Sequence, residues 1–124
     1  MDVTPLIPND KYVINKYGDN SITVNNEKFL GNLIITPNKI LKWEITDFAS
    51  LTIENFRPLV DEKLEILLLG CGTKHLMLNN SIKYGLKSLL PNISIEVMTT
   101  GAACRTYNIL LAEGRIVGCA LIAV

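Results

Sequence analysis

Apolar stretches of two kinds alternate along the second half of the chain, residues 65–124. Three of them, EILLLG, ISIEVM and RIVGCALIAV, have the length and continuity of buried strands. The two between them, NNSIKYGLKSLLPN and TGAACRTYNILLAEG, place apolar residues at helical spacing. Pro91 ends the first predicted helix, and a threonine cap and Gly114 bound the second. The alternation of strands and helices predicts parallel βαβ units with helical crossovers.

The first part of the chain, residues 12–45, contains short β-type segments separated by turn residues. KYVINKY and SITVNN flank the turn GDN, whereas KFLGNLIITP ends at Pro37 and KILKWEI follows it. These segments predict an antiparallel β meander with one face in solvent. Gly31, inside the third segment, predicts a β-bulge or a close backbone approach.

A short helix is expected in the connection between these two parts. Thr52 is a suitable N-cap, and Pro58 prevents a long regular helix, so we expect a short one that is partly 3₁₀. No repeat or low-complexity linker divides the chain. The sequence therefore predicts one α/β domain over residues 1–124, with a β-rich part at 12–45 and a βαβαβ part at 65–124.

Composition and charge narrow the classes of partner. Of the 124 residues, 48% are apolar and 19% are charged, with 12 Lys and Arg against 12 Asp and Glu. A neutral chain lacks the basic surface that binds nucleic acid or an anionic membrane, and we expect neither as a partner. The first 14 residues have no basic region, and no apolar run approaches the roughly 20 residues of a membrane span, so no membrane insertion is expected. Three cysteines without a C-x-x-C pair indicate reduced thiols in a soluble intracellular protein.

Two loops form the candidate functional surface, because ligands of open α/β sheets bind beyond the carboxyl ends of parallel strands. The first loop is GCGTKH, and the second begins with MTTG. If the strands before them are neighbours, the loops open at one edge, at 70–75 and 99–105. The candidate ligand or partner residues are Gly70, Cys71, Gly72, Thr73, Thr99, Thr100, Gly101, Arg105 and Asn108.

Known catalytic patterns fit this surface only in part. Gly70 and Gly72 lack the third glycine of a dinucleotide-binding fingerprint, and the P-loop spacing is absent. Cys71 and His75 suggest a thiolate–imidazole pair, but no carboxylate stands at a recognisable spacing to orient the histidine. A metal site would need cysteines from distant loops around the only histidine of the chain. We therefore assign no catalytic residue, no metal ligand and no cofactor.

The start of the second predicted helix has two interpretations. Thr99 or Thr100 can cap it, and Gly101 with two alanines leaves its first amides uncovered, which favours an anion. Arg105 in the second turn could bind a carboxylate or phosphate with two hydrogen bonds. The alternative is structural: the alanines let the helix pack closely on the sheet, and Arg105 pairs with a carboxylate such as Glu113.

The second half also carries a resemblance. LLLGCGT, followed by IEVMTTGAACRTYNILLAEGRIVGCALI, resembles the small α/β family that includes mitochondrial complex I assembly factor 3 and short bacterial and archaeal relatives. That family has an LLLGTG strand and turn, and later a V-x-M-x-T-x-x-A-x-x-T-x-N-x-L-x-x-E-G-R block before a hydrophobic strand. The match is strong over residues 65–124 and looser through TVNNEKFLGNLIITPNKILKW. Cys71 departs from the threonine that the family often has, which argues against a thiol nucleophile.

This resemblance implies a compact three-layer β/β/α-type fold of mixed sheets packed with helices. For the eukaryotic members, which are in the mitochondrial matrix, it implies a role in the assembly of respiratory NADH:ubiquinone oxidoreductase. It implies no cofactor. Because the chain lacks a presequence pattern, we expect a bacterial member in the cytoplasm, or at the periphery of the inner membrane through a partner.

We therefore favour a non-enzymatic binding or assembly module over an enzyme. Its partner would be a protein, either a respiratory-complex subunit or another assembly factor. The alternative function is a small-molecule binding protein or enzyme in which Thr99, Thr100 and Arg105 hold an anionic group. A third hypothesis is self-association into a homo-oligomer.

Overall fold

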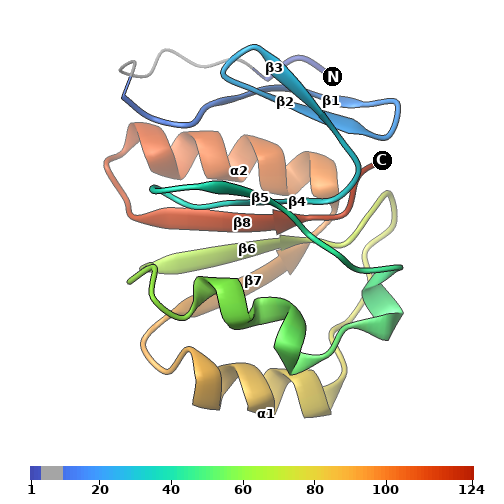
Figure 1. Ribbon diagram of the computed structural model, residues 1–124, viewed down its shortest axis with the longest axis vertical. Coiled ribbons are helices and arrows are strands. Elements are labelled where there is room, and N and C mark those ends of the chain that lie inside the picture. The colour runs from blue at the N-terminus through green and yellow to red at the C-terminus, as the bar shows by residue number, and fades with distance from the viewer. Residues whose placement is uncertain (4–9) are drawn as a thin grey trace.

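The computed structural model describes residues 1–3 and 10–124. Residues 4–9, which belong to the N-terminal segment without a targeting pattern, lie outside the described residues. The described chain forms a mixed α/β domain with two β-sheets (Figure 1). Its strands are β1 (Ile14–Gly18), β2 (Ser21–Val24), β3 (Glu27–Leu30), β4 (Leu33–Ile35), β5 (Ile40–Lys42), β6 (Ile66–Gly70), β7 (Ser94–Met98) and β8 (Val117–Leu121). Its helices are the 3₁₀ helices η1 (Phe48–Ser50) and η2 (Ile53–Leu59) and the α-helices α1 (Asn80–Leu89) and α2 (Thr100–Ala112).

The first sheet contains three antiparallel strands in the order β1-β2-β3. The predicted turn after Gly18 joins β1 to β2, and Asp19 and Asn20 adopt φ angles of 53° and 57° there. Asn25 and Asn26, with φ angles of 49° and 67°, make the same kind of turn between β2 and β3. Asparagine and aspartate tolerate this left-handed conformation, which matches the twist of a two-residue hairpin.

The second sheet has five strands in the order β5-β4-β8-β6-β7, and its last three strands are parallel, as predicted. The predicted meander is divided between the sheets, because β4 and β5 leave the first one and β4 pairs antiparallel with β8. Gly31 lies between β3 and β4 with a φ angle of 83°, and a Cβ there would meet no atom within 4 Å. Gly31 therefore makes the turn between the sheets, and the predicted bulge or close approach is wrong.

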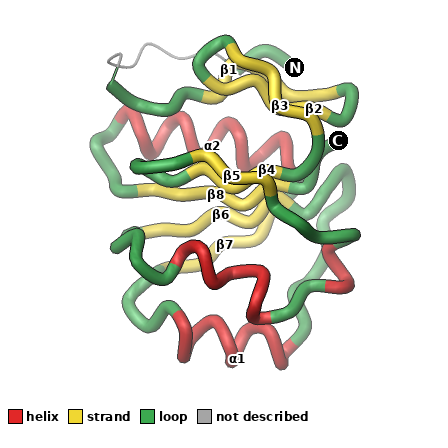
Figure 2. Tube along the Cα trace, viewed as in Figure 1, coloured by secondary structure: helices red, strands yellow, loops and turns green. Residues whose placement is uncertain are grey.

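Helices lie on both sides of the five-stranded sheet (Figure 2), and a hydrophobic core packs against each of its faces. On one face, Leu33 and Leu68 pack with α2 and the three-stranded sheet. On the other face, Ile34 and Leu67 pack with α1, η1 and η2. The alternation of side chains along each strand explains this division.

Local sequence signals explain how the helices begin and end. At η2, the Thr52 N–H donates to Asn55 Oδ1 at 2.7 Å, so the predicted cap is present. Helix α1 begins where Asn79 Oδ1 accepts from the Ile82 N–H at 2.9 Å. Helix α2 ends before Gly114, whose φ angle of 79° suits the residue after a C-cap.

Candidate functional site

The two predicted loops lie side by side at one edge of the sheet. Strands β6 and β7 are parallel neighbours, with Gly70 opposite Met98. The Cys71 N–H donates to Met98 O at 2.9 Å, and the Thr100 N–H donates to Gly72 O at 2.9 Å. The strand order thus brings the loop after β6 against the start of α2.

Thr100 joins these segments from inside the protein. Its Oγ1 accepts from the Gly72 N–H at 3.0 Å and donates to Ile122 O at 2.7 Å. The residue is 0% exposed. Thr99 is the N-cap by its backbone conformation, but its side chain makes no capping hydrogen bond. The Thr100 hydroxyl and amide are therefore both used within the fold.

Glycine is needed at positions 70 and 72 for different structural reasons. A Cβ at Gly70 would lie 2.9 Å from Leu121 Cδ2 and 3.0 Å from Thr100 Cα. Gly72 has a φ angle of 110°, which other residues rarely adopt. Close packing accounts for the first glycine, and the turn out of β6 accounts for the second.

The Cys71 thiol is a buried part of its loop. Its Sγ donates to Lys74 O and accepts from the Leu76 N–H, both at 3.3 Å. Thr73 and His75 in the same loop are exposed to solvent. The bonds of Cys71 to the backbone hold the loop in shape and do not aim the thiol at an imidazole.

The other two cysteines lie deeper in the core. Burial raises the pKa of the Cys104 thiol to about 12, and it also raises the pKa of Cys119. Both thiols are thus held in the protonated, unreactive form. Over residues 1–3 and 10–124, no group of three or more His, Cys, Asp or Glu side chains could hold a metal ion.

Tyr17 of β1 covers the first turn of α2. A Cβ at Gly101 would lie 2.6 Å from the Tyr17 hydroxyl oxygen, so a larger residue there would displace this ring. Arg105, which is exposed, donates from Nη1 to the same oxygen at 3.0 Å. The expected partner of Arg105, Glu113, is replaced by Tyr17.

Asn108 ties α2 to the N-terminal segments and is only 3% exposed. Its Nδ2 donates to Val3 O at 3.0 Å and to Ile14 O at 2.8 Å, and its Oδ1 accepts from the Ile14 N–H at 3.1 Å. Beside it, the Tyr107 hydroxyl donates to Tyr12 O at 2.7 Å. Asn108 is therefore part of the core framework and does not lie on the predicted surface.

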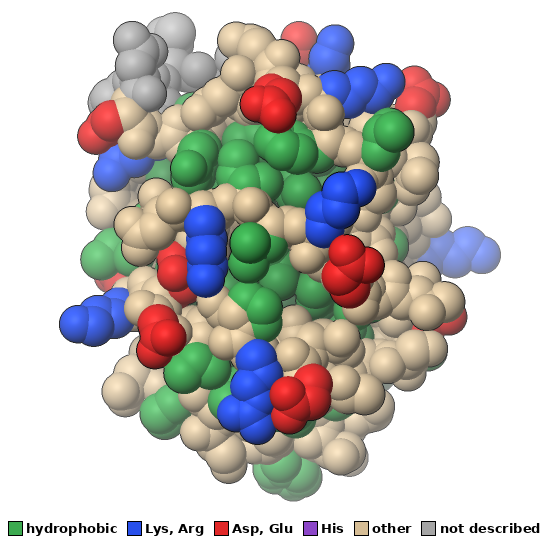
Figure 3. Space-filling view, viewed as in Figure 1, with side chains coloured by type: hydrophobic (Ala, Val, Ile, Leu, Met, Phe, Trp, Pro, Cys, Tyr) green, Lys and Arg blue, Asp and Glu red, His purple; other side chains and the backbone are tan. Residues whose placement is uncertain are grey.

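The exposed segment of the first loop runs from Thr73 to Met77, two residues beyond the predicted surface, and Arg105 of the second loop is exposed as well. Leu76 and Met77 are 43% and 80% exposed, although both are apolar. Figure 3 shows acidic and basic side chains interspersed over one face of the molecule, with hydrophobic side chains visible between the three-stranded sheet and the β4–β5 hairpin. No one sign of charge dominates that face.

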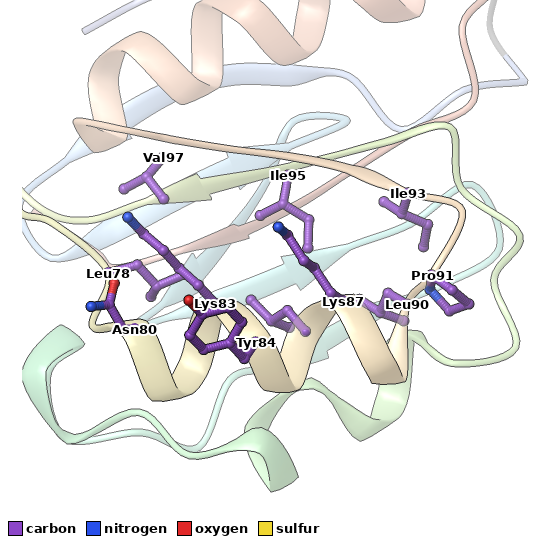
Figure 4. Close-up of a pocket in the computed structure, with 11 residues that line it drawn as sticks. Leu78, Asn80, Lys83, Tyr84, Lys87, Leu90, Pro91, Ile93, Ile95 and Val97 are labelled. Carbon is purple, nitrogen blue, oxygen red and sulfur yellow. The ribbon is translucent and has the colours of Figure 1, made fainter.

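A groove of about 370 Å³ lies between α1 and β7 (Figure 4). It starts next to the exposed segment 73–77 and follows the edge of the sheet. It is lined by Leu78, Asn80, Lys83, Tyr84, Leu86, Lys87, Leu90, Pro91, Ile93, Ile95 and Val97. The sequence interpretation missed this groove, because the apolar stripe of α1 and the alternation in β7 both indicate core packing.

Similar folds occur in solved structures. An outer membrane protein from Bartonella henselae superimposes with a TM-score of 0.83 and 33% identity, covering 92% of this chain and 96% of that chain. A Bordetella pertussis protein described as an Mth938-like domain gives a TM-score of 0.79 and 27% identity, covering 99% of this chain and 92% of that chain. The fold thus places the protein in the class of Mth938-like α/β domains.

The family follows from the sequence. A family described as a protein of unknown function (DUF498/DUF598) matches residues 14–122, and the chain belongs to it. The chain is also 28% identical over 111 residues to NADH dehydrogenase (ubiquinone) 1 alpha subcomplex assembly factor 3 of Rattus norvegicus. That alignment covers 88% of this chain and 59% of the relative, so the chain spans about three fifths of the relative's length. Among the described residues, no helix has the length and apolar character to cross a membrane.

Proposed function

We propose that the protein is a non-enzymatic binding module that helps to assemble a multisubunit protein complex. The observation that carries this proposal is the relationship to the assembly factor 3 proteins, which extends over 88% of this chain. By that relationship, we infer respiratory NADH:ubiquinone oxidoreductase as the complex, and a subunit or another assembly factor as the partner. The proposed location is the bacterial cytoplasm, with a partner holding the protein at the inner membrane.

The geometry of the two loops supports a binding module more than an anion site or an enzyme. An anion at the start of α2 would need free donors, but the Thr100 hydroxyl and amide bond to Ile122 and Gly72. The Cys71 thiol is buried and bonded to its own loop. What the edge offers to a partner is the exposed apolar pair Leu76 and Met77.

The test is deletion of the gene in its own host, followed by quantification of assembled NADH:ubiquinone oxidoreductase on native gels. We expect less mature complex, accumulation of a partial assembly, and rescue by the wild-type gene. A parallel thermal-shift screen with phosphate, sulfate and dicarboxylates should leave the melting temperature unchanged. Normal amounts of mature complex in the deletion strain would contradict the assembly role, and a saturable shift abolished by Arg105→Ala would favour the anion site.

A further inference from the structure

The groove between α1 and β7 combines an apolar lining with an open sheet edge. Ile95 and Val97 of β7 point into it from one side, and Leu86 of α1 and Leu90, just after the helix, belong to the other side (Figure 4). Tyr84, which is 69% exposed, stands on the rim. An aromatic side chain that is this exposed beside an apolar groove is typical of a contact surface.

One side of the β7 backbone is open along the same groove. β7 is the last strand of the five-stranded sheet, and within residues 1–3 and 10–124 it pairs only with β6. The Ser94 N–H donates to Glu65 O, and Met98 O accepts from the Cys71 N–H, so both residues turn their backbone groups toward β6. Because these groups alternate along a strand, the N–H and C=O groups of Ile95 and Val97 point to the open edge. The two residues that line the groove thus also offer the hydrogen bonds that another strand would use.

The usual devices that protect an edge strand are missing from β7. It contains no proline, and it pairs with β6 in continuous register from Ser94 to Met98, without a bulge. Its one charged residue, Glu96, alternates with Ile95 and Val97, so its side chain lies on the face away from the groove. An edge of this kind accepts an added strand readily.

The charged residues that line the groove indicate which kind of protein segment would bind there. Lys83 and Lys87 are one helical turn apart on α1, both are exposed, and both line the groove. Neither groove lysine takes part in the ion pairs Lys39–Glu62, Arg57–Glu54 and Arg115–Glu65 found in the described parts of the chain. None of the described residues that line the groove is acidic. A binding segment with carboxylates opposite these lysines would complement them.

We propose that the α1–β7 groove binds an extended, acidic segment of a partner protein, which adds to the edge of β7 as a further strand. Alternate apolar side chains of that segment enter the groove against Ile95 and Val97. Its Asp or Glu side chains contact Lys83 and Lys87. This inference rests on the proposed function in one respect, namely that the partner is a protein.

The experiment places a photo-crosslinking amino acid at Tyr84 in the full chain, expressed in the native host. A matched position is Ile109 of α2, which is 59% exposed and lies outside the groove. We expect Tyr84, and not Ile109, to crosslink to a protein segment that alternates apolar residues and contains Asp or Glu. The crosslinked segment is then synthesised as a peptide for binding measurements.

With that peptide, charge reversal tests the contacts of its acidic residues with the two lysines, and hydrogen exchange tests its addition to the edge of β7. Lys83→Glu combined with Lys87→Glu should weaken binding at least tenfold, whereas Lys16→Glu combined with Lys28→Glu, an equal charge change on the first sheet, should leave it within twofold. Added peptide should also slow amide exchange at Ile95 and Val97. Thermal melts confirm that each variant is folded.

The outcomes separate this proposal from the proposed function. A Tyr84 crosslink to a second copy of this chain, to a lipid or to a segment without acidic residues overturns the groove assignment. So does exchange protection that avoids β7. If the partner crosslinks at Ile109 and not at Tyr84, the groove assignment fails while the binding role stands. If no protein crosslinks at either position and the complex assembles normally without the gene, the proposed function fails.

Discussion

A single oxygen atom of Thr100 connects three separate segments of the chain. Its hydrogen bonds with Gly72 and Ile122 link the loop after β6, the start of α2 and the chain beyond β8. The side-chain amide of Asn108 has a similar role, because it forms hydrogen bonds with both the N–H and the C=O of Ile14. Buried polar groups of this kind stabilise the fold when every bond is made, and they cost free energy when one partner is removed.

Replacing Asn108 by leucine should destabilise the protein strongly. The change keeps the branched shape of the side chain but replaces its amide by methyl groups, which leaves the Ile14 N–H and C=O and the Val3 C=O without this partner. We therefore expect a loss of about 2–4 kcal/mol in the free energy of unfolding. Urea unfolding followed by circular dichroism measures it. Arg105→Leu, an exposed change on the same helix, should have a much smaller effect, and equal losses would contradict the anchoring role of Asn108.

The role of Thr100 is tested by a pair of substitutions. Thr100→Ser keeps the hydroxyl that bonds to Gly72 and Ile122, whereas Thr100→Val keeps the shape and loses both bonds. We expect valine to reduce the free energy of unfolding by about 1–3 kcal/mol more than serine does. If the two variants unfold at the same urea concentration, the hydroxyl is not a structural group.

At the scale of single elements, the sequence predicted most of the second half. The strands β6, β7 and β8 and the helices α1 and α2 were expected from periodicity, and Pro91 and Gly114 mark helix ends as predicted. The meeting of the two loops followed from the order of parallel strands. The contact between Arg105 and Tyr17 could not be predicted, because it joins residues 88 positions apart in elements whose packing no local pattern specifies.

The edge position of β7 predicts a pattern of hydrogen exchange in the free protein. Glu96 directs its amide to β6, while the amides of Ile95 and Val97 face the open edge. In exchange experiments followed by NMR, we expect the Glu96 amide to be protected and its two neighbours to exchange much faster. Uniform protection across the three amides would show that the edge is covered in solution, for instance by a second copy of the chain.

At the scale of the whole molecule, the division of the strands into two sheets was the main feature missed. Alternation alone does not tell a strand which sheet it joins, because either sheet presents a pleated face to the core. The contrast between β3 and β4 did indicate that these two strands belong to different sheets. Glu27–Leu30 has mostly exposed residues, whereas Leu33–Ile35 is buried throughout, and an uninterrupted apolar run is typical of a strand covered on both faces.

Because α2 is buried between two sheets, the free energy of unfolding should decrease at alkaline pH. Burial raises the pKa of Cys104 from its ordinary value of 9.0 to about 12, so the folded protein keeps a proton that the unfolded chain releases above pH 9. The contribution of this thiol is complete below pH 9 and is lost as pH rises toward about 12. Burial also raises the pKa values of Tyr107 and Cys119, which lie in the same core.

We therefore expect the free energy of unfolding to fall above pH 9, with Cys104 contributing at most about 1.4 kcal/mol per pH unit. Urea unfolding at a series of pH values from 7 to 11 gives this slope. Cys104→Ala removes the titrating thiol, so this variant should be less stable at pH 7 but should lose stability more gradually above pH 9. Parallel pH profiles for the two proteins would mean that the Cys104 thiol ionises as easily in the folded core as in the unfolded chain.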